Sequence, residues 1–260
     1  MRVRFPQGVQ RQTIMAKNLY IIGGCNGAGK TTASYTILPE ILDCKEFVNA
    51  DEIARGLSPF NPNSMAIEAG KLMLKRIKEL LSRDESFAIE TTLATRSYIN
   101  LVHQAQAKGY LVTLVFFWLN SPDLALRRIA ERVQNGGHDI PEPTARRRYI
   151  AGIDNLFNLY IPEVDYWMIY DNSESPCLPV AQGKTTKTST LYDEDKLNKS
   201  RVMSEKDEKL LTEKLLLGLK ISERRMLEEK ALHGQDIVVS SDDNTIKRIP
   251  ASVALAALSK

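Results

Sequence analysis

Short apolar runs alternate with longer amphipathic stretches between residues 18 and 173. The apolar runs are rich in Val, Ile, Phe and Tyr, and the run Leu111–Leu119 is apolar almost throughout. A strand that is buried on both faces of a parallel sheet has this pattern. The predicted strands are Leu19–Gly23, Glu46–Ala50, Ser86–Glu90, Tyr110–Leu119 and Asp165–Tyr170.

Helical periodicity fills the stretches between these runs. The clearest helix follows Ser121, which suits an N-cap, and has Pro122 at its first position, with Gly136 and Gly137 beyond its end. The predicted helices are Lys30–Leu42, Ser64–Leu81, Ser97–Lys108, Ser121–Gln134 and Thr144–Tyr160. Strands and helices that alternate in this way predict an α/β fold, a three-layer sandwich around a mostly parallel central sheet.

The pattern changes after residue 172. Two short segments, Pro179–Gly183 and Thr190–Tyr192, flank a polar turn and predict a hairpin. We expect a main domain at residues 17–200, preceded by a disordered extension at residues 1–16, with Met15 as an alternative start to Met1.

A small C-terminal module is predicted at residues 203–260. Ser204 and Asp207 resemble a capping box that opens an apolar stripe of helical spacing, which ends near Gly234. The segments Asp236–Ser241 and Thr245–Ile249 then flank a polar turn and predict a β-hairpin.

Composition excludes several classes of protein. Of the 260 residues, 43% are hydrophobic and 26% are charged, which is typical of a globular chain. A net charge of +3 is too small to indicate a nucleic-acid partner, and no apolar stretch approaches the ~20 residues of a membrane span. The three cysteines are odd in number and form no CxxC pair, which indicates a reducing, cytoplasmic location.

A phosphate-binding loop is the strongest motif in the chain. The pattern G-x-x-x-x-G-K-[ST] is complete from Gly24 to Thr31, directly after a predicted strand and at the start of a predicted helix. Backbone N–H groups and the helix N-terminus would hold the phosphates of ATP, Lys30 would reach the β- and γ-phosphates, and Thr31 would ligate Mg²⁺. The expected cofactor-binding residues are Gly24, Cys25, Asn26, Gly27, Ala28, Gly29, Lys30, Thr31 and Thr32.

Two signatures of other P-loop proteins are missing. The chain has no NKxD motif for guanine, and its best apolar run ends in Asn120 and Ser121 without the carboxylate expected of an AAA or ABC ATPase. These absences favour a small-molecule kinase over a switch GTPase or a motor-type ATPase.

Carboxylates follow two other predicted strands. Asp51 follows one strand, and ligands of parallel sheets bind beyond strand ends, so Asp51 could accept a proton from an attacking hydroxyl. It could instead cap a helix over Glu52–Gly56. Glu90 could bind a substrate hydroxyl or a Mg²⁺-bound water, and Thr92 could bind substrate; a cap for the helix near Ser97 is the alternative for both.

Arginines are concentrated between residues 127 and 148. Two arginine-bearing helices joined by a Gly-Gly-His turn suggest a lid over ATP, whose guanidinium groups would offset charge on the transferred phosphoryl group. We expect most of these six arginines to lie on a solvent-exposed basic face and not on the nucleotide. We expect Arg132 and either Arg147 or Arg148 to contact nucleotide, and His138 to shape the lid.

Taken together, the motifs resemble the zeta toxin family of P-loop kinases over residues 17–195. The resemblance rests on Gly24–Thr32, the Asn49-Ala-Asp51 strand end, Glu90-Thr-Thr92, and the segment from Arg132 to Pro141 with the arginines that follow it. One departure is Ala94, where some members have an arginine; the nearest one here is Arg96.

The resemblance implies an activity, a substrate and a partner. Such enzymes use ATP and Mg²⁺ to phosphorylate a hydroxyl of UDP-N-acetylglucosamine, with Asp51 as general base, Glu90 and Thr92 on the sugar nucleotide, and Lys30, Arg132 and Arg148 on the transferred charge. It also implies an antitoxin. That antitoxin could act in trans, or the module at residues 203–260 could be a fused equivalent; a C-terminal brace for the kinase is the alternative.

Overall fold

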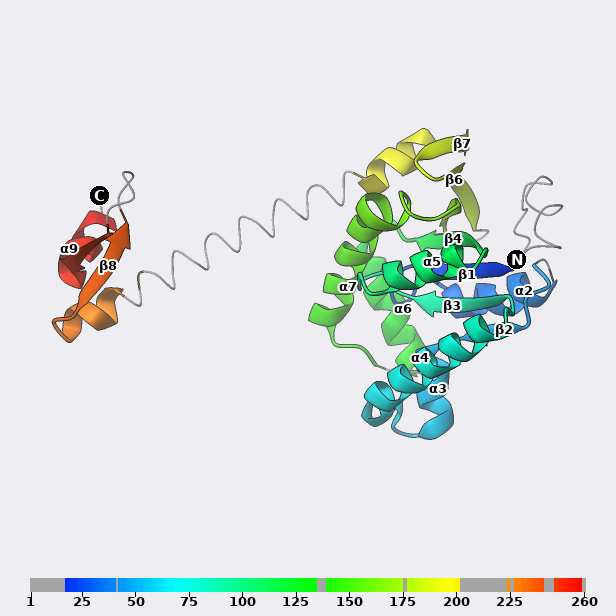
Figure 1. Ribbon diagram of the computed structural model, residues 1–260, viewed down its shortest axis with the longest axis horizontal. Coiled ribbons are helices and arrows are strands. Elements are labelled where there is room, and N and C mark those ends of the chain that lie inside the picture. Colours follow the sequence, from blue (N-terminus) through cyan, green and yellow to red (C-terminus); the bar gives the residue numbers. More distant parts are fainter. Residues whose placement is uncertain are drawn as a thin grey trace. The chain divides into compact units, whose positions relative to one another are not determined.

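Seven strands form one mixed sheet in the computed structural model (Figure 1). The model describes residues 17–40, 42–134, 139–174, 177–201, 224, 227–240 and 246–258. The strand order is β2-β3-β1-β4-β5-β6-β7, and the first five of these strands run parallel. They are β1 (Asn18–Gly23), β2 (Glu46–Val48), β3 (Phe87–Thr91), β4 (Leu111–Trp118) and β5 (Tyr166–Asp171). The predicted α/β fold with a mostly parallel sheet is confirmed.

The sheet ends in an antiparallel hairpin. Strands β6 (Leu178–Lys184) and β7 (Lys187–Leu191) pair with each other, and β6 pairs with β5. The predicted hairpin therefore exists, with both strands longer than expected, and it extends the parallel sheet at the β5 edge. Residues 194–201, which follow it, are helical.

Helices lie on both faces of the sheet because the chain crosses it in two directions. The crossover through α2 (Lys30–Glu40) leads from β1 to the β2 edge, whereas α5 (Tyr98–Ala107) leads from β3 past β1 to β4. Right-handed crossovers in opposite directions place their helices on opposite faces. The remaining helices of this unit are α3 (Ala50–Leu57), the 3₁₀ turn Pro62–Met65, α4 (Ala66–Ser82), α6 (Pro122–Gln134), α7 (Glu142–Asn155) and the π-helical turn Leu156–Tyr160.

The end of strand β2, near the site, differs from the prediction. Strand β2 ends at Val48, two residues earlier than predicted, because Asn49 caps helix α3. The Asn49 Oδ1 atom accepts from the backbone N–H groups of Asp51 at 2.8 Å and Glu52 at 3.4 Å. The capping alternative for Asp51 is therefore wrong: Asp51 lies inside the first turn of the helix that Asn49 caps.

Helix α6 begins as predicted. Ser121 Oγ accepts from the backbone N–H of Leu124 at 3.2 Å, and Pro122 is the first helical residue. The Gly-Gly-His turn beyond this helix, including His138, lies outside the described residues. So do the capping box of Ser204 and Asp207 and most of the stripe that follows it.

The chain divides into two compact units, residues 1–205 and 206–260. In the second unit β8 (Asp236–Ser240) and β9 (Ile246–Pro250) form an antiparallel hairpin. Helix α9 (Ala251–Leu258), which the sequence reasoning missed, follows directly, and Ala251 N donates to Gln235 O at 3.1 Å. No helix in the described part of the chain is both long and apolar enough to cross a bilayer.

Candidate active site

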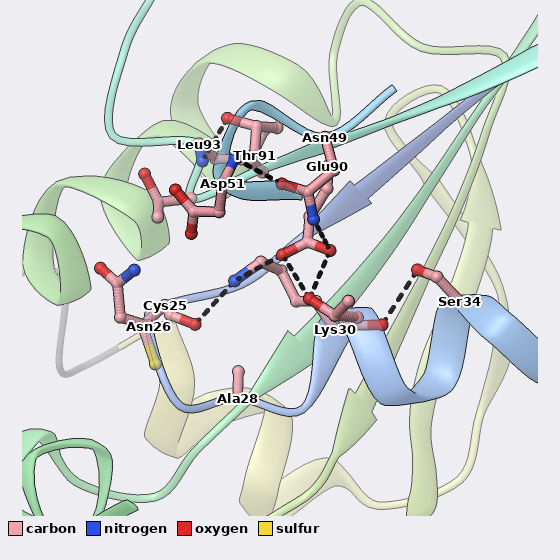
Figure 2. A network of polar contacts seen from close by, with 12 residues as sticks. Cys25, Asn26, Ala28, Lys30, Ser34, Asn49, Asp51, Glu90, Thr91 and Leu93 are labelled. Atoms are coloured by element: carbon pink, nitrogen blue, oxygen red, sulfur yellow. Dashed lines mark hydrogen bonds and ion pairs between the residues drawn. The ribbon is translucent and has the colours of Figure 1, made fainter. Parts of the chain in front are cut away.

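The loop from Gly24 to Thr31 joins β1 to α2 at the carboxyl edge of the sheet (Figure 2). Gly24 and Gly29 have φ angles of 139° and 80°, which disfavour residues with a Cβ atom. A Cβ at Gly24 would lie 2.4 Å from the carbonyl oxygen of Phe117, and one at Gly29 would lie 2.5 Å from Asn172 Nδ2. Phe117 in β4 and Asn172, directly after β5, thus leave no room for a Cβ atom at these two glycines.

Lys30 is buried within the loop that precedes it. Its side chain is 7% exposed, and Nζ donates to the carbonyl oxygen of Cys25 at 2.9 Å. The same Nζ atom lies 3.7 Å from Glu90 Oε1. A buried ammonium group at the N-terminus of a helix favours binding of phosphate oxygens.

Glu90 faces the loop from the neighbouring strand. Parallel pairing of β1 with β3 places Ile22 opposite Glu90. Thr31 Oγ1 donates to Glu90 Oε2 at 2.8 Å, and Asn49 Nδ2 donates to the same oxygen at 2.9 Å (Figure 2). Burial raises the pKa of the Glu90 carboxyl above its ordinary value, although Lys30 and Thr31 act against that rise.

This geometry excludes the capping alternative for Glu90. Its carboxylate binds Thr31 and Asn49, not a helix terminus. Thr92 directly follows β3, and its Oγ1 accepts from Ala94 N at 3.4 Å. Ala94, which stands where an arginine was expected from the resemblance, thus contacts Thr92 through its backbone.

Glu90 also corrects the argument against AAA-type ATPases. The apolar run that forms β4 is followed by Asn120, where such an ATPase would have a carboxylate. The sheet order shows that the phosphate-loop strand has a second neighbour, β3, and that β3 carries a carboxylate hydrogen-bonded to Thr31. The carboxylate beside the phosphate loop therefore comes from β3 and not from β4.

Asp51 lies between two cavities. The first, of about 440 Å³, is bordered by Lys30, Asp51, Glu90 and Thr92 among others. The second, of about 630 Å³, is bordered by Thr31, Thr32, Asp51, Arg55 and Arg132 among others. The Asp51 carboxylate points toward the phosphate loop, into space that Asn26 and Lys30 also border (Figure 2).

The arginines separate into three groups. Arg148 borders both cavities and donates from Nη1 to Asn26 Oδ1 at 3.4 Å, while Arg147 borders the first cavity and Arg132 the second. Arg128 donates to the carbonyl oxygen of Ser173 at 3.0 Å. Arg146 instead forms ion pairs with Asp123 at 2.7 Å and Glu142 at 2.8 Å. One arginine of the 146–148 run thus connects α7 to α6, and the other two face the site.

Sequence reasoning missed several residues of this site. Asn49 was noted only as part of a strand end, and Thr95, Tyr98 and Arg55, which border the cavities, were not considered. An Asn directly before an acidic helix start is a capping signal, so the role of Asn49 at α3 could have been found. The cavity walls depend on how distant helices pack, which no local pattern contains.

The phosphate loop, its neighbouring carboxylate and the sheet order together define a P-loop nucleotide-binding α/β domain. Residues 19–150, which are more than half of the chain, match a family model described as an AAA domain, and the chain belongs to that family. Residues 203–260 match a domain of unknown function, DUF8506.

A related sequence and two solved structures extend the comparison. An uncharacterised protein of Haemophilus influenzae is 29% identical over 136 residues, 52% of this chain and 95% of the relative. The AvrRxo1-ORF1:AvrRxo1-ORF2 crystal structure with sulphate ions superposes with a TM-score of 0.60 at 16% identity, covering 74% of this chain and 66% of that chain. A structure of the PezAT toxin–antitoxin system of Streptococcus pneumoniae gives a TM-score of 0.50 at 18% identity, covering 77% of this chain and 92% of that chain.

These structures confirm the fold expected from the resemblance to zeta toxins. At such low identities they show the fold alone, and this chain spans only 66% of the matched chain of the AvrRxo1 complex. The same AvrRxo1 complex is also known with ATP, with a TM-score of 0.57 at 15% identity.

Proposed function

We propose that the protein is a kinase that transfers the γ-phosphoryl group of ATP to a hydroxyl of a sugar nucleotide, with UDP-N-acetylglucosamine as the first candidate acceptor. The observation that carries the proposal is the position of Asp51. Its carboxylate borders both the cavity that contains Lys30 and the larger cavity beside it. Because residues of the phosphate-loop segment border both cavities, Lys30 the first and Thr31 the second, Asp51 lies near the expected phosphates and has open space beside it for a second substrate. A neighbour with the same fold is known with ATP, which supports ATP as the donor.

Mg²⁺ fits the residues that surround Thr31. The Thr31 hydroxyl donates its hydrogen bond to Glu90, which leaves the lone pairs of Oγ1 available to a cation. Among the described residues no three His, Cys, Asp or Glu side chains come together as a metal site. That agrees with Mg²⁺ bound by one hydroxyl, phosphate oxygens and water, where it would neutralise charge on the phosphates.

The remaining catalytic roles are assigned to individual residues of the site. Lys30 would bind the β- and γ-phosphates, Asp51 would accept the proton of the attacking hydroxyl, and Thr92 would orient the acceptor. Arg148 and Arg132 would stabilise charge that develops on the transferred group, since guanidinium groups match phosphate oxygens geometrically. Phosphoryl transfer depends mainly on positioning and charge, and this site supplies both.

Transfer of ³²P from labelled ATP to UDP-N-acetylglucosamine tests the proposal. We expect one phosphorylated product, and we expect Asp51→Asn to lose transfer while it retains nucleotide binding. Glu68→Gln is a matched control, because Glu68 is an exposed carboxylate on α4 that pairs with Lys71. Full transfer by Asp51→Asn would refute its role as base. No transfer to the sugar nucleotide, with transfer to another compound in a metabolite pool, would redirect the acceptor to another hydroxylated metabolite or antibiotic.

A second candidate is an ATP-binding regulatory protein with little catalysis. The second compact unit at residues 206–260 and its separate family match favour an additional, non-catalytic role for this part of the chain.

We propose that residues 203–260 are a regulatory, antitoxin-like module, and a separate antitoxin in trans is the other arrangement. Deleting residues 203–260 and measuring growth after induction tests this. Growth inhibition that is unchanged by the deletion would refute the regulatory role.

A further inference from the structure

A single carboxamide connects the two acidic groups of the site. Asn49 is buried, with 5% of its surface exposed, and it is the residue between β2 and α3. Its Oδ1 accepts from the N–H groups of Asp51 and Glu52, while its Nδ2 donates to Glu90 Oε2 at 2.9 Å. Figure 2 shows Asn49 above Glu90, with its amide nitrogen directed at that carboxylate.

Helix capping alone does not account for asparagine at this position. Asp and Ser cap helices about as well as Asn, because each offers an oxygen to the first free N–H groups. Only Asn offers its acceptor and its donor on two separate atoms, whereas Ser has a single hydroxyl for both and an ionised Asp has no donor. An aspartate here would place a second carboxylate beside that of Glu90, which is 9% exposed. Asparagine is thus suited to this position because its amide nitrogen donates to Glu90 while its oxygen caps α3.

Asn49 also limits what Glu90 can bind. Glu90 accepts from Asn49 and Thr31, and in that position its Oε1 stays 3.7 Å from Lys30 Nζ. Without the Asn49 donor, the carboxylate would retain Thr31 and Lys30 as partners. A closer pair between Glu90 and Lys30 would compete with phosphate for the ammonium group, because both interactions use the same N–H donors.

We propose that Asn49 is a positioning residue of this site, which holds Glu90 on Thr31 and fixes the first turn of α3, and with it Asp51, against the same carboxylate. The inference rests on the proposed function for its catalytic part, but its binding part does not. Through Glu90 and Thr31, Asn49 acts on the place where Mg²⁺ and the phosphates would bind. Through the cap of α3, it acts on the place from which Asp51 would reach the acceptor.

Asn49→Ser separates the two contacts, because serine keeps a capping oxygen and loses the amide donor. The probe is a non-hydrolysable ATP analogue, titrated calorimetrically into the full-length protein with Mg²⁺ and with EDTA. We expect the affinity gain that Mg²⁺ provides to fall about tenfold or more, as for the loss of a hydrogen bond to a charged group. The melting temperature should fall by only a few degrees, because the cap of α3 is kept. Asn61→Ser is the matched control, since Asn61 precedes the Pro62–Met65 turn without a side-chain cap bond.

A double-variant cycle decides whether Asn49 acts through Glu90. If it does, Asn49→Ser should weaken Mg²⁺-dependent binding in the wild type but hardly at all in a Glu90→Gln background. Equal losses in both backgrounds would overturn the proposal, as would wild-type binding by Asn49→Ser. A wild-type protein that binds nucleotide with Mg²⁺ but phosphorylates no sugar nucleotide would refute the proposed acceptor and leave this test intact.

Discussion

Gly152 in helix α7 packs against the carbonyl oxygen of Thr92 so closely that a Cβ atom at residue 152 would lie 2.4 Å from that oxygen. Three residues further on, Asn155 Nδ2 donates to the Leu93 carbonyl oxygen at 2.7 Å. Leu93 is itself buried in the left-handed region, with a φ of 57°. Helix α7, which carries Arg148, is thereby held directly on the loop that follows Glu90.

Gly152→Ala should therefore push α7 away from this loop. We expect a loss of about 1–3 kcal/mol in the free energy of unfolding, as for an overpacked core, and a lower kcat for phosphoryl transfer. Gly70→Ala is the matched control, because Gly70 is also helical and nothing described lies within 4 Å of a Cβ there. It should stabilise the protein by about 0.5–1 kcal/mol. Urea denaturation of both variants measures the difference, and equal effects would contradict the close contact.

Arg148→Ala should reduce kcat about 100-fold or more, which is the usual cost of removing a group that stabilises transition-state charge. Arg146→Ala should change kcat less than about threefold, because its partners Asp123 and Glu142 are exposed and such pairs contribute ~1 kcal/mol or less. Steady-state kinetics with ATP and the acceptor compare the two variants. The reverse order of effects would show that α7 presents a different arginine to the site.

Thr31→Val removes a hydroxyl group and nearly preserves the shape of the side chain. We expect phosphoryl transfer to fall at all Mg²⁺ concentrations, because both the cation contact and the hydrogen bond to Glu90 are lost. Thr31→Ser, which retains the hydroxyl, should recover most of the activity. Transfer measured over a range of Mg²⁺ concentrations, with EDTA as the zero point, tests this. If Thr31→Ser is as inactive as Thr31→Val, the hydroxyl alone is not sufficient, and full transfer by Thr31→Val would refute any role for the hydroxyl.

The ion pair between buried Asp171 and half-buried Lys196 makes stability depend on pH. Burial raises the pKa of Asp171, but hydrogen bonds from Ser173 and Lys196 outweigh burial and leave the pKa below its ordinary value. A carboxyl whose pKa is lowered by folding stabilises the protein above its unfolded pKa of about 3.9, and that stability is lost as the pH falls through the folded pKa. Lys196→Met should lower the melting temperature near pH 7, and the difference from wild type should shrink below about pH 4.

Lys199→Met is the control for that measurement. Lys199 borders the same small cavity as Asp171 and Lys196, and it forms no ion pair in the part of the chain that is described. Its melting curve should follow the wild type at every pH. A constant difference between Lys196→Met and wild type from pH 7 to pH 3 would mean that Lys196 stabilises the fold through packing instead of charge.

Local patterns predicted the strands of the sheet because each buried strand is a short apolar run with a clear end. They also predicted the phosphate loop, since strand, glycines, Lys30 and Thr31 are contiguous. They could not reveal that β3 is the neighbour of β1, because strand order depends on pairing between residues about 70 positions apart, such as Leu19 with Phe87. The contact between Glu90 and Thr31 follows from that pairing.

The same reason explains which site residues were predicted and which were missed. Glu90 lies near the end of β3 and Asp51 shortly after β2, where a sheet collects functional groups, so residue type and position were enough to select them. Arg148 was chosen together with Arg147 because a run of three arginines does not show which ones face inward. That choice depends on the side of α7 that meets Thr92, and Gly152 sets that side by long-range packing.

The phosphate loop also depends on a residue that the ribosome adds much later. Asn172 Nδ2 donates to the carbonyl oxygen of Ala28 at 2.8 Å, across 144 positions of sequence. During synthesis the loop therefore emerges long before the partner that fixes its backbone. A nascent chain that stops short of Asn172 carries the whole nucleotide-binding motif without this bond, so we expect ATP affinity to be acquired late in translation. The proposed kinase would therefore gain its activity only after β5 has joined the sheet.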